Sequence, residues 1–326
     1  MQDVQKSVDV SYSDLGPEDW KRAIEDLAEE HGAFQPLGDK CFSAFVEAGK
    51  TLLVTFETME TVRTTSAKAR PLGHEMIISA GWSHLAILSE STSWFRDPII
   101  FGYFDRLIDD GFFEDFDSVL FYGVGACGYA AAAYSVAAPG AKVLALQPHA
   151  TMDPRLTEWD PRFPAARRLN FSDRFGYAPD MLDAAEQAFV LYDPFEDLDA
   201  MHAALFERPG VTRLRVPHGG ETLEAALQEM ELLLPLLEHA ESGTLDILSF
   251  ARLFRARRQN TTYLRRLLFR LETQGRPYLS FAMCRQVVKE RDAPFFRRRL
   301  RRLKAAAMRG DFRAPPTRAK TQDAPA

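Results

Sequence analysis

The sequence predicts an α/β fold, with a mostly parallel sheet flanked by helices and a helical extension at the C-terminal end. Short apolar runs suited to buried strands alternate with helical patterns of roughly 10 to 16 residues, an arrangement typical of parallel sheets. One of these runs, at residues 119–122, ends in glycines and leads directly into a small-residue helix. Beyond residue 243 the pattern is helical and basic.

The first third of the chain is expected to contain two helices and three strands. Pro17 stands at the start of an amphipathic pattern that predicts a helix over residues 17–28. Apolar residues at helical spacing predict another helix over residues 98–108, closed by Asp110-Gly111. Apolar runs predict strands at residues 51–56, 75–79 and 84–89.

The middle of the chain continues the alternation of strands and helices. The helix after the glycine turn stops at Pro139-Gly140. Residues 147–180 have no periodicity and are expected to cover the edge where the strands end. Further strands are predicted at residues 142–146, 186–192 and 211–216, and further helices at 199–207 and 222–237.

These patterns divide the chain into four parts. Residues 1–39 form an N-terminal helical segment, 40–243 the α/β domain, 244–310 a basic helical extension, and 311–326 a disordered tail. No apolar run approaches the roughly 18 residues that span a bilayer, and the N-terminus lacks a secretory pattern, so we expect a cytoplasmic protein. The three cysteines are far apart, which predicts neither disulfides nor a metal site, and no cofactor is expected.

Charge is distributed unevenly along the chain. Residues 251–326 hold 21 Lys and Arg against 5 Asp and Glu, a net charge of +16, while the whole chain carries −6. We expect this basic segment to lie against the acidic body of its own chain or of another subunit in a homo-oligomer. A membrane surface or another anionic partner, bound through residues 251–310, is the alternative. Nucleic acid is disfavoured because no recognition motif accompanies the charge.

The most informative segment is the glycine turn at residues 123–128. A strand, a sharp turn and a helix have the shape of a nucleophile elbow, in which a serine in G-x-S-x-G is exposed above a parallel sheet. Here the motif begins at Gly123, so that Gly125, which has no side chain, stands at the serine position. The same glycines match the G-x-G-x-x-G dinucleotide pattern, but no acidic residue follows the next strand, which disfavours that interpretation.

Residues 122–131 resemble the G-S-S-M-G-G-Y-A-A elbow of a branch of bacterial α/β-hydrolase-like proteins, some of which are encoded with polysaccharide-export functions. Residues 144–148, and residues 191–194 with Asp199 and His202, are similar to later segments of that group. The resemblance covers about residues 50–240 and implies an α/β-hydrolase-like fold. It places the family serine on Gly125 and the next family glycine on Cys127. It keeps a base at His218 and an acid among Asp193, Asp197 and Asp199.

Two interpretations of the turn stay open. In one, Cys127 is a displaced nucleophile whose pKa is lowered at a helix N-terminus, and the protein is a thiol hydrolase or acyltransferase with His218 and an aspartate. In the other, Cys127 is a packed residue, and the bare turn binds an anion or a carbonyl without attacking it. A third possibility is a non-enzymatic protein that binds partners through its Arg-rich helices.

We favour a catalytically altered protein that binds a small or carbohydrate-linked anionic ligand, in bacterial polysaccharide or envelope metabolism. The ligand site is expected at the carboxyl ends of the strands. Its lining is expected to include Gly123, Gly125, Ala126, Phe56, His149 and Arg155.

Overall fold

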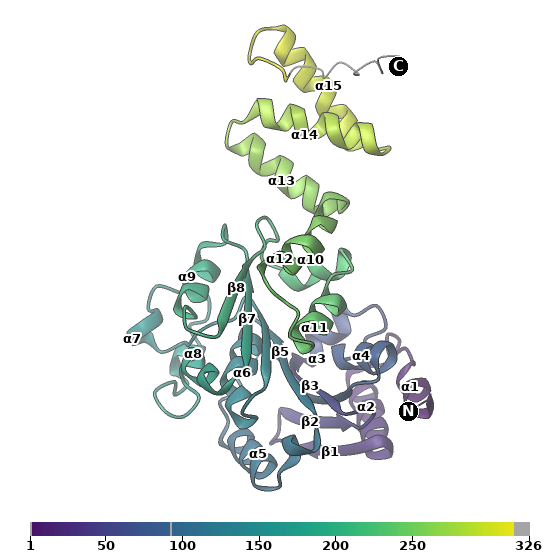
Figure 1. The fold of residues 1–326 in the computed structure, drawn as a ribbon, viewed down its shortest axis with the longest axis vertical. Coiled ribbons are helices and arrows are strands. Elements are labelled where there is room, and N and C mark those ends of the chain that lie inside the picture. The colour runs from purple at the N-terminus through teal and green to yellow at the C-terminus, as the bar shows by residue number, and fades with distance from the viewer. Residues whose placement is uncertain (1, 92, 316–326) are drawn as a thin grey trace, which may run out of the picture. The chain divides into compact units, whose positions relative to one another are not determined.

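One sheet, parallel except at one edge, organises the fold (Figure 1). The computed structural model describes residues 2–91 and 93–315. Within that part of the chain, eight strands lie in the order β1-β2-β4-β3-β5-β6-β7-β8. β2 pairs antiparallel with β1 and β4, and every other pair is parallel. The strands are β1 (Gly32–Pro36), β2 (Cys41–Val46), β3 (Thr51–Thr58), β4 (Ser83–Ser89), β5 (Ser118–Val124), β6 (Lys142–Leu146), β7 (Gln187–Tyr192) and β8 (Val211–Arg215).

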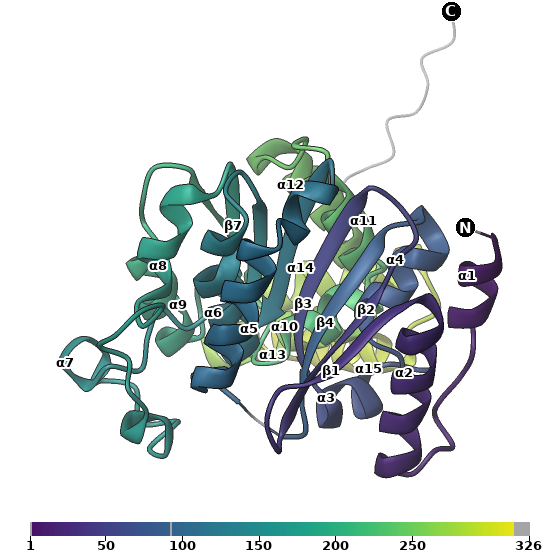
Figure 2. The ribbon, with the colours of Figure 1, turned by 90° about the horizontal axis from the view of Figure 1, so that it is seen from below.

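Helices cover both faces of the sheet. Alternate residues of a strand face opposite sides, so that Leu85 of β4 joins one buried cluster and Leu88 the other. Figure 2 shows α5 and α6 on one side of the sheet and α4 and α11 on the other. The helices over the sheet and its edges are α1 (Gln2–Val8), α2 (Pro17–His31), α3 (Met59–Thr65), α4 (Leu72–Ala80), α5 (Pro98–Asp109), α6 (Ala126–Tyr134), α7 (Pro154–Thr157), α8 (Ala178–Met181), α9 (Asp197–Leu205), α10 (Leu223–Glu229), α11 (Leu233–Glu241) and α12 (Ile247–Leu253).

The predicted fold class is confirmed. The sheet is mostly parallel, helices flank it, and helices make up the C-terminal part of the described chain. The predicted strands at 51–56, 84–89, 142–146, 186–192 and 211–216 correspond to β3, β4, β6, β7 and β8. The glycine turn lies between β5 and α6, as expected.

Three local predictions are wrong. Residues 75–79 belong to helix α4, in which Leu72 and Met76 lie one turn apart and are both buried; the helix ends at Gly81, whose φ is 69°. The helix predicted over residues 222–237 is broken into α10 and α11, with a left-handed residue at Glu231 between them (φ 56°). Strands β1 and β2, which form the antiparallel edge, were not predicted.

The chain divides into two units, Met1–Ala256 and Arg257–Ala326. The division falls after α12, because that helix contacts β8. The second unit holds α13 (Thr261–Thr273), α14 (Pro277–Glu290) and α15 (Pro294–Met308), where Leu268, Cys284 and Phe296 are buried. The tail predicted to be disordered lies, from residue 316 on, outside the described residues. In the described part of the chain, none of the helices has the length and apolar character needed to cross a bilayer.

Candidate functional site

The turn between β5 and α6 has the backbone of a nucleophile elbow. Gly125 adopts φ 60° and ψ −117°, a conformation that residues with side chains rarely adopt. Its amide donates to the Leu146 carbonyl at 2.9 Å, which fixes the turn against β6. A Cβ at Gly123 would lie 2.2 Å from the Cys127 carbonyl oxygen, so that position has no room for a side chain. The turn therefore needs these glycines for its backbone shape. This requirement accounts for the G-x-G-x-x-G spacing, and no bound dinucleotide is needed to explain it.

His149 lies next to Gly125. A Cβ on Gly125 would lie 3.8 Å from His149 Cε1, an ordinary van der Waals contact. Burial, together with neighbouring His202 and Arg162, lowers the pKa of His149 to about 3, so the ring is neutral at physiological pH. Arg162 donates to its Nε2 at 3.4 Å, which leaves the proton on Nδ1, and this buried atom has no partner among the described residues.

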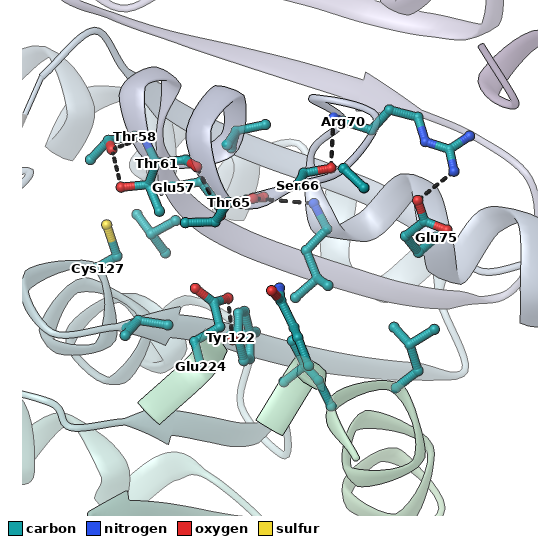
Figure 3. A pocket seen from close by; sticks show the side chains of 18 of the residues that line it. Glu57, Thr58, Thr61, Thr65, Ser66, Arg70, Glu75, Tyr122, Cys127 and Glu224 are labelled. Carbon is teal, nitrogen blue, oxygen red and sulfur yellow. Dashed lines mark hydrogen bonds and ion pairs between the residues drawn. The ribbon is translucent and has the colours of Figure 1, made fainter. Parts of the chain in front are cut away.

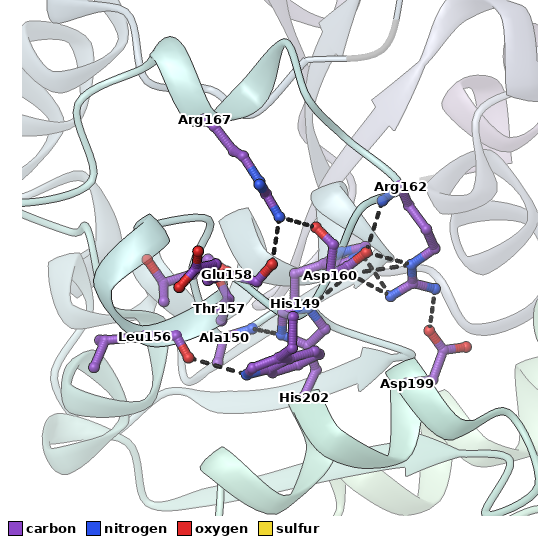
Figure 4. A network of polar contacts seen from close by, with 12 residues as sticks. His149, Ala150, Leu156, Thr157, Glu158, Asp160, Arg162, Arg167, Asp199 and His202 are labelled. Carbon is purple, nitrogen blue, oxygen red and sulfur yellow. Dashed lines mark hydrogen bonds and ion pairs between the residues drawn. The ribbon is translucent and has the colours of Figure 1, made fainter.

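A network of polar side chains continues outward from His149 (Figure 4). Arg162 bonds Asp160 at 2.8 Å and Asp199 at 2.6 Å. The Ala150 amide donates to His202 Nδ1 at 3.2 Å, so the proton of His202 is on Nε2 and is donated to Asp160 at 3.0 Å. Burial raises the pKa of Asp160, but hydrogen bonds from Arg162 and His202 outweigh it and hold the pKa below its ordinary value.

His149, Asp160 and His202 have the composition of a metal site, since their ligand atoms lie within 4.8 Å of one another. This cluster was not predicted from the sequence, because its members follow no metal-ligand spacing and only the fold brings them together. However, His202 presents a protonated Nε2, whereas a metal ligand needs a lone pair there. The Arg162 guanidinium also already neutralises Asp160. The arrangement fits a network closed by arginine better than a metal centre.

The other residues of the expected triad take part in loop contacts. The His218 ring stacks on Phe195, with centroids 4.7 Å apart and the planes 15° apart. Both carboxylate oxygens of Asp193 accept backbone amides, those of Phe195 (3.0 Å) and Gly220 (2.9 Å). Asp197 is exposed at the first position of α9.

Other expected site residues also have structural contacts. Asp199 binds the Gln147 side chain at 2.6 Å, in addition to Arg162. Arg155, whose side chain is 73% exposed, pairs with its neighbour Asp153 at 2.5 Å. Ala126 is partly buried at the first position of α6.

A cavity of about 610 Å³ lies beside the elbow, within the first unit (Figure 3). Phe56, one of the predicted ligand-binding residues, and Cys127 both line it. So do Tyr122 and Val124 of β5, together with side chains from α3, α4, α10 and α11. The volume is in the range of ordinary small-molecule sites.

Two glutamates that the sequence analysis did not single out line this cavity. Glu57, at the end of β3, accepts hydrogen bonds from the Thr55 hydroxyl (2.6 Å) and the Leu72 amide (3.1 Å). Burial raises the pKa of Glu57 to about 7, and the nearby charge of Glu224 adds to the shift. Glu224, in the first turn of α10, accepts from the Tyr122 hydroxyl at 2.7 Å, and burial raises its pKa as well. A position at the end of a strand was the one sequence signal for Glu57.

The pKa of Cys127 is opposite to what the displaced-nucleophile interpretation requires. Burial raises it well above its ordinary value, and the charges of Glu57 and Glu224 raise it further. The residue Cys127 is 8% exposed. The expected lowering of this pKa at the helix N-terminus is therefore wrong, because burial and two carboxyl groups outweigh the helix dipole.

Strand order, elbow and flanking helices together define an α/β-hydrolase-like architecture. No protein-family model and no curated protein matches the chain. Among solved structures, the capsule O-acetyltransferase of Neisseria meningitidis serogroup A in complex with CoA is similar over 61% of this chain and 92% of its own, with 11% identity and a TM-score of 0.42. An esterase from Pyrobaculum calidifontis is similar over 75% of this chain and 98% of its own, with 13% identity and a TM-score of 0.42. A hormone-sensitive lipase from a metagenome library is similar over 73% and 97%, with 15% identity and a TM-score of 0.41.

Proposed function

We propose that this chain is an α/β-hydrolase-like protein that binds a small ligand in the cavity beside its elbow and performs no covalent catalysis. One observation carries the proposal: the residue at the apex of the elbow is Gly125, in the strained backbone conformation of a nucleophile, with no group to attack a substrate. The His149 ring lies beside this apex, with Cε1 3.8 Å from the place of a Cβ on Gly125.

The state of Cys127 supports the same proposal. A thiol acts as a nucleophile in its ionised form, and burial holds Cys127 in the protonated form at neutral pH. The charged groups nearest to it, Glu57 and Glu224, are acidic, and a negative charge does not stabilise a thiolate. The thiol hydrolase or acyltransferase considered from the sequence is therefore disfavoured.

The lining of the cavity modifies the ligand class inferred from sequence. Its acidic and basic side chains are four glutamates and one arginine, Arg70, and the Arg70 guanidinium pairs with Asp9 and Glu75. An anionic ligand would meet net repulsion here. A neutral or cationic ligand with an apolar part suits these walls better than the anionic or glycan-linked ligand expected from the resemblance.

The test is a search for covalent turnover. We expect p-nitrophenyl acetate and butyrate to be hydrolysed at the rate of the buffer alone, with no burst, and a fluorophosphonate probe to leave the protein unlabelled. The Cys127→Ala and His218→Ala variants should give the same result as the unaltered protein. A stoichiometric burst that disappears in Cys127→Ala would overturn the proposal and support the thiol enzyme.

We also propose a separate role for the basic C-terminal helices in binding an anionic surface. Helix α15 carries exposed cations that form no ion pair with the described acidic residues. Arg301 and Arg302 lie three and four residues after Arg298, so these three share one face of the helix, and Lys304 lies three residues after Arg301. These residues are Arg298, Arg301, Arg302 and Lys304.

A further inference from the structure

The cavity beside the elbow ends in two carboxyl groups that come from different elements. Figure 3 shows Glu57 on one side of the cavity and Glu224, bonded to Tyr122, on the other. Among the described residues, the hydrogen bond from Tyr122 is the only one that reaches Glu224, and it engages Oε1. The second oxygen of Glu224 is therefore available to a ligand.

The Cys127 thiol is the third polar group at this end. It lines the cavity, is more than nine-tenths buried, and makes no hydrogen bond among the described residues. Cys127, Glu57 and Glu224 all line this one cavity (Figure 3). A buried polar end with unused hydrogen-bonding capacity is favourable only when a ligand or water completes it.

The rest of the cavity is suited to an apolar group. Apolar side chains from β3, α3, α4, β5 and α11 line it, and all of these elements belong to the first unit. The apolar residues include Phe56, Val62, Leu72, Val124, Leu233 and Leu234.

We infer that the cavity binds a primary alkyl amine, with the ammonium group between Glu57 and Glu224 and the alkyl chain against the apolar walls. This inference rests on the proposed function of the cavity as a ligand site. An ammonium group has three N–H donors and no acceptor, which matches two carboxylates with free lone pairs. A carboxylate or phosphate would be repelled, and an alcohol has a single donor and no charge.

The protons of the two carboxyl groups give the inference a second observable. Burial raises the pKa of Glu57 to about 7, so at pH 7 this carboxyl holds a proton in about half of the molecules when the cavity has no cation, and burial raises the pKa of Glu224 as well. An alkylammonium ion favours the ionised carboxylates, so its binding releases this proton to the solvent. The uptake of a neutral alcohol releases none.

The experiment compares three probes of equal chain length, hexylamine, hexan-1-ol and hexanoate, by isothermal titration calorimetry at pH 7. We expect hexylamine to bind at least about tenfold more tightly than hexan-1-ol, and hexanoate to bind weakest. Repeating the hexylamine titration in buffers of different ionisation enthalpy should reveal net proton release.

Variants locate the site. Glu224→Gln and Glu57→Gln should each weaken hexylamine binding about tenfold or more and leave hexan-1-ol binding nearly unchanged. Glu221→Gln, which alters an exposed glutamate three residues before Glu224 in the loop that precedes α10, is the matched control and should bind like the unaltered protein. Far-UV circular dichroism verifies that each variant is folded.

The outcomes separate the two levels of the argument. If hexan-1-ol or hexanoate binds as well as hexylamine, or if both glutamine variants bind hexylamine normally, the amine inference is overturned while the cavity remains a ligand site. If all three probes fail to bind, the cavity itself is refuted as a ligand site, and the proposed function is refuted with it.

Discussion

Glu57 should make the stability of the first unit depend on pH in an unusual direction. Its pKa is raised from 4.5 to about 7 in the folded protein, mainly by burial. Between these two values the folded state keeps a proton that the unfolded chain releases, so the free energy of unfolding decreases as pH rises. The full difference corresponds to at most about 3 kcal/mol, present below pH 4.5 and lost by about pH 7 to 8.

The groups around Glu57 determine how clearly this effect is seen. The Thr55 hydroxyl and the Leu72 amide donate to it, and His84 Nε2 donates to Thr55 Oγ1 at 2.8 Å. Burial lowers the pKa of His84 well below its ordinary value, so this imidazole carries no charge over the same range. Glu224 lies across the cavity, has a pKa raised in the same direction, and adds to the slope.

The assay is urea unfolding at pH 5, 6, 7 and 8, followed by tryptophan fluorescence, which reports on the first unit because all four tryptophans belong to it. Glu57→Gln is permanently neutral, so it should lose most of the pH slope and be about 2 to 3 kcal/mol more stable than the unaltered protein at pH 8. Glu60→Gln, which changes an exposed carboxyl at the start of α3, should keep the slope. An equal slope in all three proteins would show that Glu57 ionises normally and that this reasoning is wrong.

Three further predictions concern the elbow and the basic helices. Gly125→Ala should lower the free energy of unfolding by about 1 to 3 kcal/mol, since only the positive φ opposes it. Gly123→Ala should lower it by about 4 kcal/mol or more, because the added Cβ would meet backbone. Thermal unfolding measures both variants, and an equal loss of stability would contradict the geometry. Iodoacetamide should alkylate Cys127 at pH 8 at least about 100-fold more slowly than free cysteine, as followed by peptide mass spectrometry, and a rate near that of free cysteine would show an ionised thiol. Neutralising three cations of α15 should weaken binding to phosphatidylglycerol vesicles by about 3 kcal/mol, or roughly 150-fold, and the difference should shrink at high salt. Co-sedimentation measures the binding. Unchanged binding would exclude α15 as the contact. The triple variant replaces Arg298, Arg301 and Arg302 with serine.

The sequence was most informative where periodicity and turn signals agree. The parallel strands β3, β6, β7 and β8 and the glycine turn all combine an apolar run with a clear boundary. Helix α4 was misassigned because Met76, Ile77 and Ile78 form a short apolar run, which by itself does not distinguish a strand from a buried helix. Strands β1 and β2 lie at the antiparallel edge, where β1 is partly exposed and has no continuous apolar run.

The candidate site was predicted less completely, for a geometric reason. Phe56 and Cys127 were singled out at strand ends and do line the cavity. Glu224 became a candidate only when α10 was placed next to β5, a contact that no spacing in the chain encodes. Likewise, the neutral state of His149 depends on residues brought in by the 147–180 segment, whose path has no periodic signal.

Strand β5 connects the two halves of the proposal. Along this strand alternate side chains face opposite sides, so Phe121 packs in the core beneath α6, while Tyr122 and Val124 face the cavity. The turn that follows must keep its glycines, because a Cβ added at Gly123 or Gly128 would lie too close to neighbouring backbone, whatever residue stands at position 125. A chain that loses the nucleophile therefore keeps the elbow as a structural element, and the elbow continues to hold Tyr122 and Cys127 beside Glu57 and Glu224. On this argument the cavity depends on the elbow for its shape but not for chemistry, which is why substitutions at Gly125 should affect stability more than they affect ligand binding.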